Sequence, residues 1–233
     1  DASFIRIEPV GIDLSPADMT KLGFKKAHKE TQPSHTVVND VSISPEDIMA
    51  GTSQTVRRIW RKNEKAGIKY EVSYDPKDIK DFINMIHNVS DRTGMIPYSD
   101  KYFKITADSL FPDKDAGLLF AVLDKKRIAA ILFYNTGQTM YYAHAASYSE
   151  YRKTSPATSL ALYSLIFAHE EGCKEYDFCG VAPEGADKSH RWSGFTSFKL
   201  AFGGERRNTV GTWELPIKKG TYRLYRLLLK IAS

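Results

Sequence analysis

The sequence predicts a mixed α/β fold, in which one sheet carries helices on both faces. Strand-like segments with alternating or continuous apolar residues are separated along the chain by segments with helical spacing. Three of these strands follow one another across the short turns "KK" and "TGQ", which is typical of an antiparallel meander. A helix and a further strand come next, and this order requires a crossover connection.

The first part of the chain contains two expected strands and one long helix. The strands cover residues 4–10 and 35–43, and a polar stretch lies between them. Ser44 as the N-cap, Pro45 at the first helical position and acids in the first turn predict the start of a helix. Its helical spacing continues to Gly67, where the helix is expected to stop.

From residue 68 onward the expected order of elements is β-α-α-β-β-β-α-β-α-β. The strands are expected at residues 68–74, 117–124, 127–135, 139–147, 174–181 and 208–216, and the helices at 75–94, 99–111, 155–172 and 194–204. A basic amphipathic segment, residues 218–233, follows.

Composition and charge narrow the range of partners. Hydrophobic residues make up 42% of the 233 residues and charged residues 26%, as in ordinary globular proteins. The net charge of +5 suits an anionic partner such as a phosphate-bearing substrate, RNA or an acidic membrane surface. No apolar run approaches the roughly 20 residues that span a bilayer. The six histidines are scattered without ligand spacing, so the sequence predicts no metal site.

The two cysteines, Cys173 and Cys179, flank an expected strand. Six positions of extended chain separate them by about 20 Å, which is beyond the reach of a disulfide. Small buried core residues are expected at both positions rather than a nucleophile. Free thiols favour a reducing compartment such as the cytoplasm.

The meander, helix and strand follow the order of acetyltransferase-like (GNAT) folds. In such enzymes a Gly-rich turn after the third meander strand offers backbone N–H groups to a pyrophosphate. The corresponding turn here, "SYSEYRKTSPATS", contains no glycine, so its bulky residues obstruct close approach of a pyrophosphate and disfavour coenzyme A. Tyr151 and Arg152 occupy this turn and offer a phenol and a guanidinium suited to phosphate, with a solvated polar loop as the alternative.

Several blocks of the sequence resemble the FemABX-type aminoacyltransferases of peptidoglycan synthesis. These blocks are "FIRIEP", "SPEDIMAGTSQTVRRIWRKNEKAGIKYEV", "EYDFCGVAPEG" and "FTSFKLAFGGE" with "VGTWELP". The resemblance implies two GNAT-like domains in tandem. It also implies transfer of an amino acid from aminoacyl-tRNA to the peptide of a UDP-linked or lipid-linked muropeptide. No cofactor besides this donor, and no DNA, is implied.

The resemblance also implies a division of the chain. Residues 1–66 with 217–233 would form part of a first domain that is truncated at its N-terminal side, and residues 67–216 the second domain. The basic residues of the last segment, next to three leucines, could contact the inner face of a membrane. Packing of those leucines on the first domain is the favoured alternative. The residues concerned are Lys218, Lys219, Arg223, Arg226 and Lys230, with Leu224, Leu227 and Leu228.

The resemblance gives Lys199 a catalytic role. The family's aromatic–Lys pair is matched by Phe198 and Lys199, within the aromatic segment "WSGFTSFKLAFGGE". Attack of an amine on an aminoacyl ester builds negative charge on the carbonyl oxygen and on the leaving ribose oxygen. An ammonium in a water-poor pocket stabilises such charge by about 3 kcal/mol. A surface lysine that extends to solvent is the alternative.

Other positions match the acceptor contacts of the family. Tyr102 and Tyr151 match residues that contact the phosphate and sugar portion of the acceptor, and Tyr98 stands where some members carry arginine. This departure fits a lipid-linked acceptor as well as a UDP-linked one, and core packing is the alternative for these tyrosines. The strand carboxylates Glu8 and Asp177 are candidate proton acceptors for the attacking ammonium, although activated esters react without an enzyme base.

A basic helix is the candidate surface for tRNA. Five cations are expected on one broad face of it, where they would neutralise RNA phosphates. They are Arg57, Arg58, Arg61, Lys62 and Lys65. A solvated helix face is the alternative. The function predicted is therefore aminoacyl transfer in cell-wall synthesis; an acyl-CoA-dependent N-acyltransferase and a non-catalytic module that binds RNA or wall precursors are the alternatives.

Overall fold

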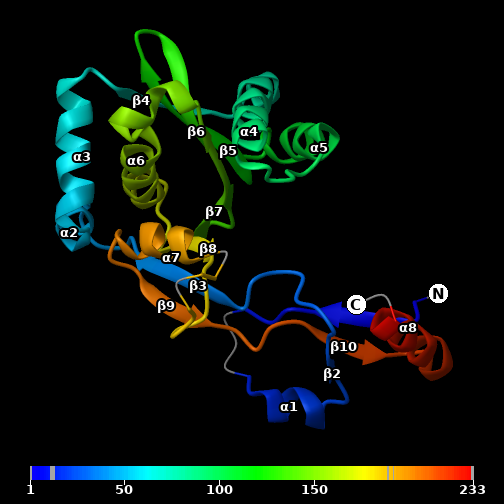
Figure 1. Cartoon of the computed structure of the whole chain (residues 1–233). Coiled ribbons are helices and arrows are strands. Elements are labelled where there is room, and N and C mark those ends of the chain that lie inside the picture. Colours follow the sequence, from blue (N-terminus) through cyan, green and yellow to red (C-terminus); the bar gives the residue numbers. More distant parts are fainter. Residues whose placement is uncertain (1, 11–13, 188, 191, 232–233) are drawn as a thin grey trace. The chain divides into compact units, whose positions relative to one another are not determined.

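The computed structural model describes residues 2–10, 14–187, 189–190 and 192–231 (Figure 1). The chain divides into two compact units. Unit 1 is Asp1–Thr36, Gly180–Ser193 and Arg206–Ser233, and unit 2 is Val37–Cys179 and Gly194–Glu205. This division differs from the expected boundary at residue 66, because the helix before that boundary packs in unit 2. The tandem GNAT-like arrangement stays a prediction.

The main sheet has seven strands in the order β4-β5-β6-β7-β8-β3-β9, and limits of the two units fall within β3, β8 and β9. The strands are β3 (His35–Asp40), β4 (Lys69–Ser73), β5 (Ala116–Leu123), β6 (Lys126–Asn135), β7 (Thr139–Ser147), β8 (Glu175–Gly180) and β9 (Glu205–Asn208). Strands β4 to β7 pair antiparallel, whereas β7 and β8 pair parallel. The meander and the mixed α/β sheet are therefore confirmed.

Helices cover both faces of this sheet, as Figure 1 shows. The helices α4 (Ile79–Thr93) and α5 (Asp100–Leu110) bury an apolar cluster against β5 and β6, with Leu118 and Phe120 among its members. On the opposite face α6 (Pro156–Glu170) packs against the same strands, and Phe167 contacts Phe133 edge to face. The side chains of each strand alternate between the two faces, which lets both sides be buried.

The long helix expected up to Gly67 is two helices, α2 (Pro45–Gly51) and α3 (Gln54–Lys65). Thr52 and Ser53 between them are extended, and Ser53 caps α3 with its side chain. The Ser53 N–H donates to the carbonyl oxygen of Ala201 at 2.8 Å. A bond from another part of the chain therefore takes the place of a helical one, and the expectation of a single helix is wrong. The second helix, α3, packs on α6.

The strand expected at 208–216 is also divided. β9 ends at Asn208, and β10 (Trp213–Pro216) begins after Gly211, whose φ of +72° favours glycine. In unit 1, β10 lies between β1 (Phe4–Ile7) and β2 (Lys25–Lys26) in a three-stranded antiparallel sheet. The stretch before β2 forms a short helix, α1 (Pro16–Lys21), with a capping box at Ser15.

Unit 1 also contains the last helix, α8 (Lys219–Ile231). Its Tyr222 is buried and donates to the fully buried carboxylate of Glu214 at 2.9 Å, and Arg6 binds the same carboxylate at 2.6 Å. The leucines lie on another side of the helix. Leu224, Leu227 and Leu228 are 56%, 56% and 57% exposed, so the expectation that they pack on the first domain is wrong for the described residues. Tyr222 and Tyr225 take the inward positions instead, where they contact Phe4.

Two further findings concern the described residues as a whole. None of their helices is both long and apolar enough to cross a bilayer. Within the same residues, no group of three His, Cys, Asp or Glu side chains is placed to hold a metal ion.

Candidate functional site

The strands β7 and β8 part from one another in unit 2. Their parallel ladder runs from Thr139↔Glu175 to Tyr141↔Asp177 and then ends, although β7 continues to Ser147 and β8 to Gly180. In α/β sheets, ligands bind beyond the carboxyl ends of parallel strands where neighbouring strands separate. The end of this ladder is therefore the first place to look for a site.

Strand β7 has an irregularity just after the ladder ends. Phe133 pairs with Tyr142 and Leu132 with His144, so Ala143 has no partner on β6. Such a bulge bends a strand and changes the direction of its side chains, and bulges are common next to active sites. Here it lies between Tyr142, whose ring contacts Phe178 at 5.4 Å, and His144, whose ring contacts Tyr98 and Phe103.

The short helix α7 (Ser193–Leu200) supplies Lys199 to this region. Lys199 is only 9% exposed, unlike a lysine that extends to solvent. The ring of Phe198 meets that of Phe202 at 5.1 Å, and Phe202 meets Phe178 of β8 at 5.0 Å. Burial lowers the pKa of Lys199, and the nearby Cys179 and Asp177 oppose this shift. The structure thus places Lys199, Phe198 and Asp177 in one neighbourhood.

The end of β8 has an unusual backbone. Cys179 has φ +58°, a left-handed conformation that residues other than glycine seldom adopt. The side chain of Asp177 stabilises it, because Oδ1 accepts the Cys179 N–H at 2.6 Å. Burial raises the pKa of the Cys179 thiol to about 12, so it stays protonated at neutral pH and is a poor nucleophile. Asp177 is therefore a local support for this turn, whatever further role it has.

Tyr98 and Tyr102 form an aromatic group with His144. The rings of Tyr98 and Tyr102 stack at 4.5 Å, and His144 meets Tyr98 at 5.4 Å and Phe103 at 5.3 Å. The hydroxyl of Tyr102 lies 3.0 Å from that of Tyr134. Burial lowers the pKa of His144 to about 4, so the imidazole is neutral at neutral pH. Tyr98 is 58% exposed and leaves a ring accessible for a ligand.

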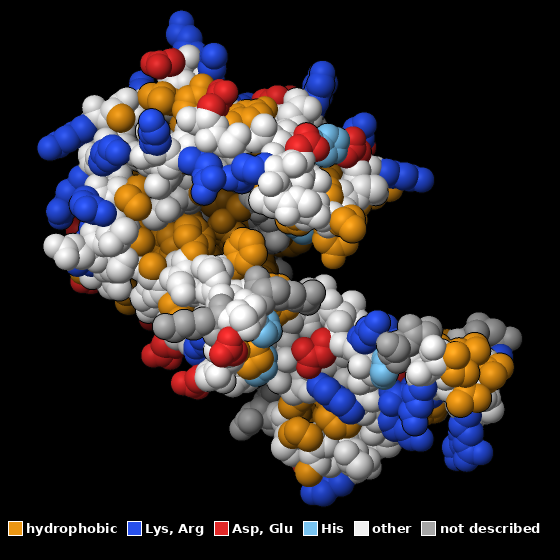
Figure 2. All heavy atoms as spheres, in the orientation of Figure 1, with side chains coloured by type: hydrophobic (Ala, Val, Ile, Leu, Met, Phe, Trp, Pro, Cys, Tyr) orange, Lys and Arg blue, Asp and Glu red, His pale blue; other side chains and the backbone are white. Residues whose placement is uncertain are grey.

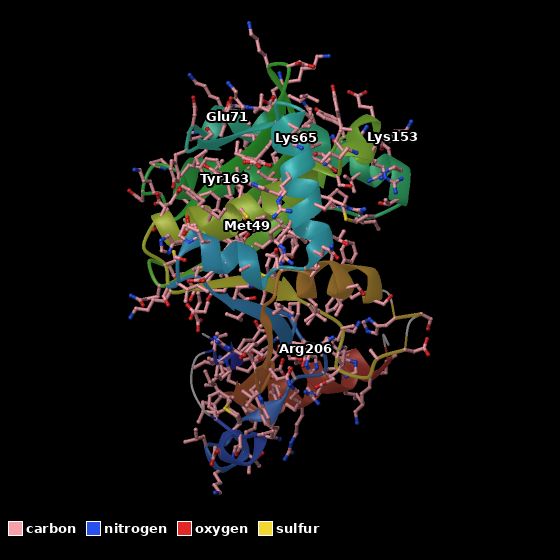
Figure 3. All side chains as sticks on the ribbon, turned by 90° about the vertical axis from the view of Figure 1, so that its left-hand side faces the viewer. Met49, Lys65, Glu71, Lys153, Tyr163 and Arg206 are labelled. Carbon is pink, nitrogen blue, oxygen red and sulfur yellow. The ribbon has the colours of Figure 1, made fainter. Side chains whose placement is uncertain are left out.

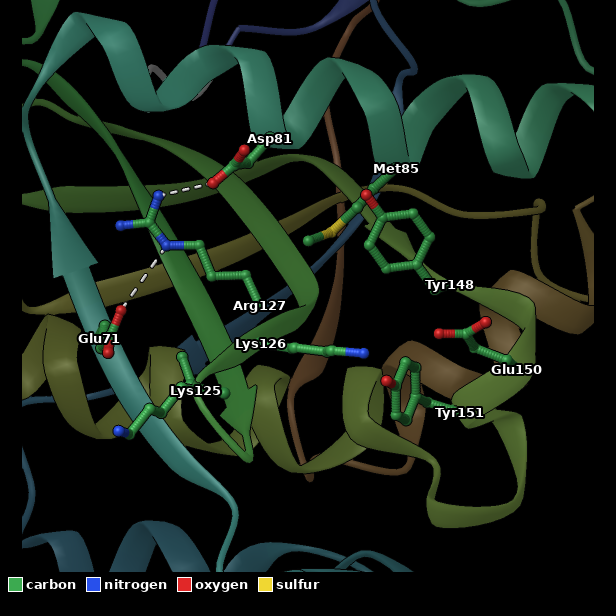
Figure 4. Close-up of a pocket in the computed structure, with 10 residues that line it drawn as sticks. Glu71, Asp81, Met85, Lys125, Lys126, Arg127, Tyr148, Glu150 and Tyr151 are labelled. Atoms are coloured by element: carbon green, nitrogen blue, oxygen red, sulfur yellow. Dashed lines mark hydrogen bonds and ion pairs between the residues drawn. The ribbon is translucent and has the colours of Figure 1, made fainter.

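Tyr151 and Arg152 lie elsewhere in unit 2, on the 3-10 turn η2 (Ser149–Thr154). Tyr151 lines a cavity of about 420 Å³, which Figure 4 shows, and Arg152 is exposed. Among the described residues no hydrogen bond or ring contact joins Tyr151 to Tyr102. The structure therefore divides the expected acceptor residues between an aromatic group and a cavity.

Glu8 belongs to unit 1 and serves a structural purpose there. Its Oε1 accepts the N–H groups of Thr31 at 3.1 Å and Gln32 at 2.8 Å, and also the hydroxyl of Thr212. This carboxylate fixes the chain around residues 31–32 against the segment that leads into β10. The contacts give a reason for an acid at this position that does not involve catalysis.

The basic helix α3 differs from expectation at one position. Arg57 turns back and donates to the carbonyl oxygens of Ala50, at 2.9 Å, and Thr52, so it closes the end of α2 and does not join the other cations. Lys62 donates to the carbonyl oxygen of Lys153 on η2 at 3.3 Å. Arg58, Arg61 and Lys65 are exposed.

Figure 2 shows Lys and Arg side chains gathered along the border where α3 lies in Figure 1. Figure 3 looks onto this helix, with Lys65 at one end of it. The expectation of five cations on one face is therefore corrected for Arg57 and retained for the exposed residues.

Residues that the sequence did not single out are also part of these sites. His144 and Tyr134 belong to the aromatic group, and Lys126, Tyr148 and Glu150 line the cavity beside Tyr151. The only signal for His144 was its position two residues from Tyr142 in an otherwise apolar strand. Nothing in the local sequence distinguishes Lys126 from Lys125 next to it, and both are exposed.

Comparisons with known proteins find similarity between this chain and the FemAB family. The model of the FemAB family matches residues 124–230. A lipid II:glycine glycyltransferase of Staphylococcus haemolyticus (strain JCSC1435) is 23% identical, over 94% of this chain and 70% of the relative.

Solved structures show the same fold. The crystal structure of FemX superposes with a TM-score of 0.85 at 21% identity, over 96% of this chain and 74% of FemX. The C-terminal domain of a putative lysylphosphatidylglycerol synthetase from Agrobacterium fabrum gives a TM-score of 0.60 at 12% identity, over 90% and 67% of the two chains. The family model, the curated relative and the fold of FemX together support the resemblance of this chain to the FemABX-type family.

Proposed function

We propose that this chain acts in the synthesis of peptidoglycan interpeptide bridges, as a transferase that adds an amino acid to the peptide stem of a muropeptide precursor. The donor would be an aminoacyl-tRNA that carries a small amino acid such as Gly, Ala or Ser. One observation carries the proposal most directly: Lys199 is buried near Asp177, the residue of β8 at which the parallel ladder with β7 ends. The naming of a relative as a lipid II:glycine glycyltransferase supports the same reaction class.

The chemistry assigned to Lys199 is electrostatic. The amine of the acceptor attacks the ester carbonyl, a C–N bond forms, and the C–O bond to the ribose breaks. The proton released by the amine ends on the ribose hydroxyl. Negative charge develops first on the carbonyl oxygen and then on the leaving oxygen. The ammonium of Lys199, held away from water, would stabilise both by about 3 kcal/mol.

The aromatic group is the proposed place for the acceptor. Tyr98 presents an exposed ring, Tyr102 a phenol, and His144 a neutral imidazole that donates or accepts a hydrogen bond without changing charge at neutral pH. These groups suit a neutral sugar or peptide better than a diphosphate, since none of them carries a cation. A lipid-linked acceptor is proposed ahead of a UDP-linked one because a relative is named as a lipid II:glycine glycyltransferase, and the reaction would then take place at the cytoplasmic face of the membrane.

The exposed cations of α3 are the proposed contact for the tRNA. Arg58, Arg61 and Lys65 carry no ion pair among the described residues and are free to meet phosphates. Such contacts are sequence-independent and weaken with salt. They would bind the body of the tRNA while its aminoacyl end reaches Lys199.

The test is a transfer assay with radiolabelled aminoacyl-tRNA and lipid-linked or UDP-linked muropeptide, using the wild type, Lys199→Met and Lys199→Arg. Loss of a charge that acts in the transition state lowers kcat by about a hundredfold in Lys199→Met. Lys199→Arg keeps the cation and is expected to retain part of the rate.

The alternatives predict different results in the same assay. Product formed from acetyl-CoA, with none from charged tRNA, would replace the proposal with an acyl-CoA-dependent reaction. Binding of tRNA or precursor without any transfer would indicate a non-catalytic module. Equal rates for Lys199→Met and the wild type would refute the role of Lys199.

A further inference from the structure

The cavity beside Tyr151 lies apart from the residues assigned above to the acceptor sugar and to the transferred group. It measures about 420 Å³ and is formed by β4, α4, the β5–β6 hairpin and the chain around η2. Its lining residues are Glu71, Asp81, Met85, Val122, Lys125, Lys126, Arg127, Tyr148, Glu150 and Tyr151.

Part of the charge in this cavity is already paired. Arg127 lies 2.8 Å from Asp78, 2.8 Å from Asp81 and 3.7 Å from Glu71, so these acids are compensated within the protein. Figure 4 shows two of these pairs, from Arg127 to Asp81 and to Glu71, on one side of the cavity. The charged groups that remain available to a ligand therefore lie on the other side of the cavity.

Lys126 is the cation that remains. No ion pair joins it to an acid among the described residues, and in Figure 4 it points toward the side of the cavity that carries Tyr148, Glu150 and Tyr151. Lys125 turns away from it in the same view. The ammonium of Lys126 thus points toward the carboxylate of Glu150. The rings of Tyr148 and Tyr151 lie beside them.

The floor of the cavity is apolar. Met85 and Val122 line it and are 1% and 9% exposed, so only a small part of each side chain reaches the cavity. A ligand that fits must present an anion to Lys126, a hydrogen-bond donor to Glu150 and a small apolar group to Met85 and Val122. A peptide that ends in a free carboxylate, with a small side chain and an N–H group next to it, has this combination.

We propose that this cavity binds the carboxylate end of a peptide, with Lys126 on the carboxylate and Glu150 on the adjacent N–H. The proposal rests on the proposed function, since the peptide would be the stem of the muropeptide acceptor. RNA is a poorer fit, because Glu150 would repel a chain of phosphates. The cavity would then fix one end of the stem while another part of it reaches the transferred amino acid.

The binding test uses N-acetyl-Ala-Ala with a free carboxylate and the same peptide with a C-terminal amide. Affinity is measured by NMR titration of the protein. The wild type should bind the acid at least tenfold more tightly than the amide. In Lys126→Gln this preference should disappear, because the cation that recognises the carboxylate is gone. Lys104→Gln on the exposed surface of α5 makes the same change of charge outside the cavity and should behave as the wild type.

Two results would overturn the proposal. One is equal affinity of the wild type for the acid and the amide. The other is a short RNA oligonucleotide that perturbs the same resonances and loses affinity in Lys126→Gln. Circular dichroism of each variant establishes that it is folded before these affinities are compared.

The transfer assay separates this inference from the proposed function. If the wild type transfers an amino acid and Lys126→Gln raises the KM for the acceptor tenfold with kcat retained, the cavity is a subsite of that reaction. If the wild type transfers and the KM is unchanged, the inference fails while the function stands. Carboxylate-dependent peptide binding in the absence of any transfer would support the cavity and count against the reaction.

Discussion

The fold shifts the pKa values of two cations in unit 2, Arg127 and Lys199, in opposite directions. The side chain of Arg127 is 25% exposed, and Asp78, Asp81 and Glu71 surround it. Its guanidinium also lies 4.1 Å from the centre of the Phe120 ring. Hydrogen bonds to Asp78 raise its pKa. Lys199 is more deeply buried, and burial lowers its pKa in spite of the nearby Cys179 and Asp177.

The difference indicates what each cation is for. Burial of a charge costs free energy unless partners compensate it. Arg127 is compensated by carboxylates and holds the β5–β6 hairpin to the start of α4, so its position is explained by stability. The pKa of Lys199 is lowered by burial, so the fold disfavours its charged form relative to water. Proteins keep such groups where function requires them, often with some loss of stability.

The largest effect is expected from the variant that removes the costly cation. Lys199→Met should lower transfer by about a hundredfold, as argued above, yet leave the free energy of unfolding unchanged or higher by about 1 kcal/mol. Urea denaturation followed by fluorescence measures the second quantity. A loss of stability of several kcal/mol would contradict the comparison, because Lys199 would then be a structural residue like Arg127.

The reverse pattern is expected for Arg127→Met. Three carboxylates lose their common partner, so the free energy of unfolding should fall by about 2 kcal/mol at neutral pH, while kcat stays within a fewfold of the wild type. The pKa of Asp78 is lowered mainly by its bond to Arg127. This stabilisation is therefore present above the ordinary aspartate pKa of 3.8 and is lost as the pH falls through the lowered value.

Urea denaturation at several pH values provides the control for Arg127→Met. The difference between the variant and the wild type should shrink as the solution is made acidic. A difference that is the same at neutral and acidic pH would show that lost packing over Phe120, and not charge, is responsible.

A smaller effect is expected from Asp177→Asn, which separates two roles of this residue. The asparagine oxygen can still accept the Cys179 N–H, so the turn is kept, but the negative charge near Lys199 is lost. The pKa of Lys199 should then fall further. Activity that needs the ammonium is lost as the pH rises through that pKa, so the alkaline limb of the kcat profile should move to lower pH.

The value of kcat on the plateau at neutral pH distinguishes the electrostatic role of Asp177 from a role in proton transfer. A plateau within about threefold of the wild type fits the electrostatic role. A fall of kcat at every pH, without movement of the alkaline limb, would support Asp177 as the proton acceptor. Asp108→Asn, at an exposed position of α5, is the matched control and should leave both features unchanged.

Local patterns were enough to predict most of the fold. The apolar runs and short turns predicted the β5–β6–β7 meander, and the order of helix and strand predicted the parallel pairing of β8. The break between α2 and α3 was not predictable in this way, because the Ser53 N–H is bound by Ala201, far along the sequence. The leucines of α8 are likewise exposed because the face of the helix that carries Tyr222 is the one that packs on Glu214. The helical pattern alone does not show which face this is.

The site was predictable to a lesser extent. The aromatic residues around Lys199 were visible in its own segment, and in the structure Phe198 and Phe202 of this segment contact one another while Phe202 contacts Phe178. The cavity was not visible, since it is formed by residues from β4, α4, the β5–β6 hairpin and η2. A basic run also does not tell which of its members is engaged, as Arg57 shows by closing the end of α2. Such assignments depend on tertiary structure that periodicity does not contain.

The exposed cations of α3 are a third kind, neither compensated by acids nor buried, and they should give the smallest effects. Arg58→Gln and Arg61→Gln should each weaken tRNA binding modestly and reduce the slope of log affinity against log salt by about one unit for every phosphate that is no longer neutralised. Arg57→Gln is the matched control, because its guanidinium is engaged by Ala50 and Thr52. It should cost about 1 kcal/mol of stability and leave the slope unchanged. Filter binding at several salt concentrations measures the slopes. If Arg57→Gln changed the slope as much as Arg58→Gln does, the distinction between engaged and exposed cations on this helix would be lost. If none of the three changed it, the tRNA would bind elsewhere on the chain.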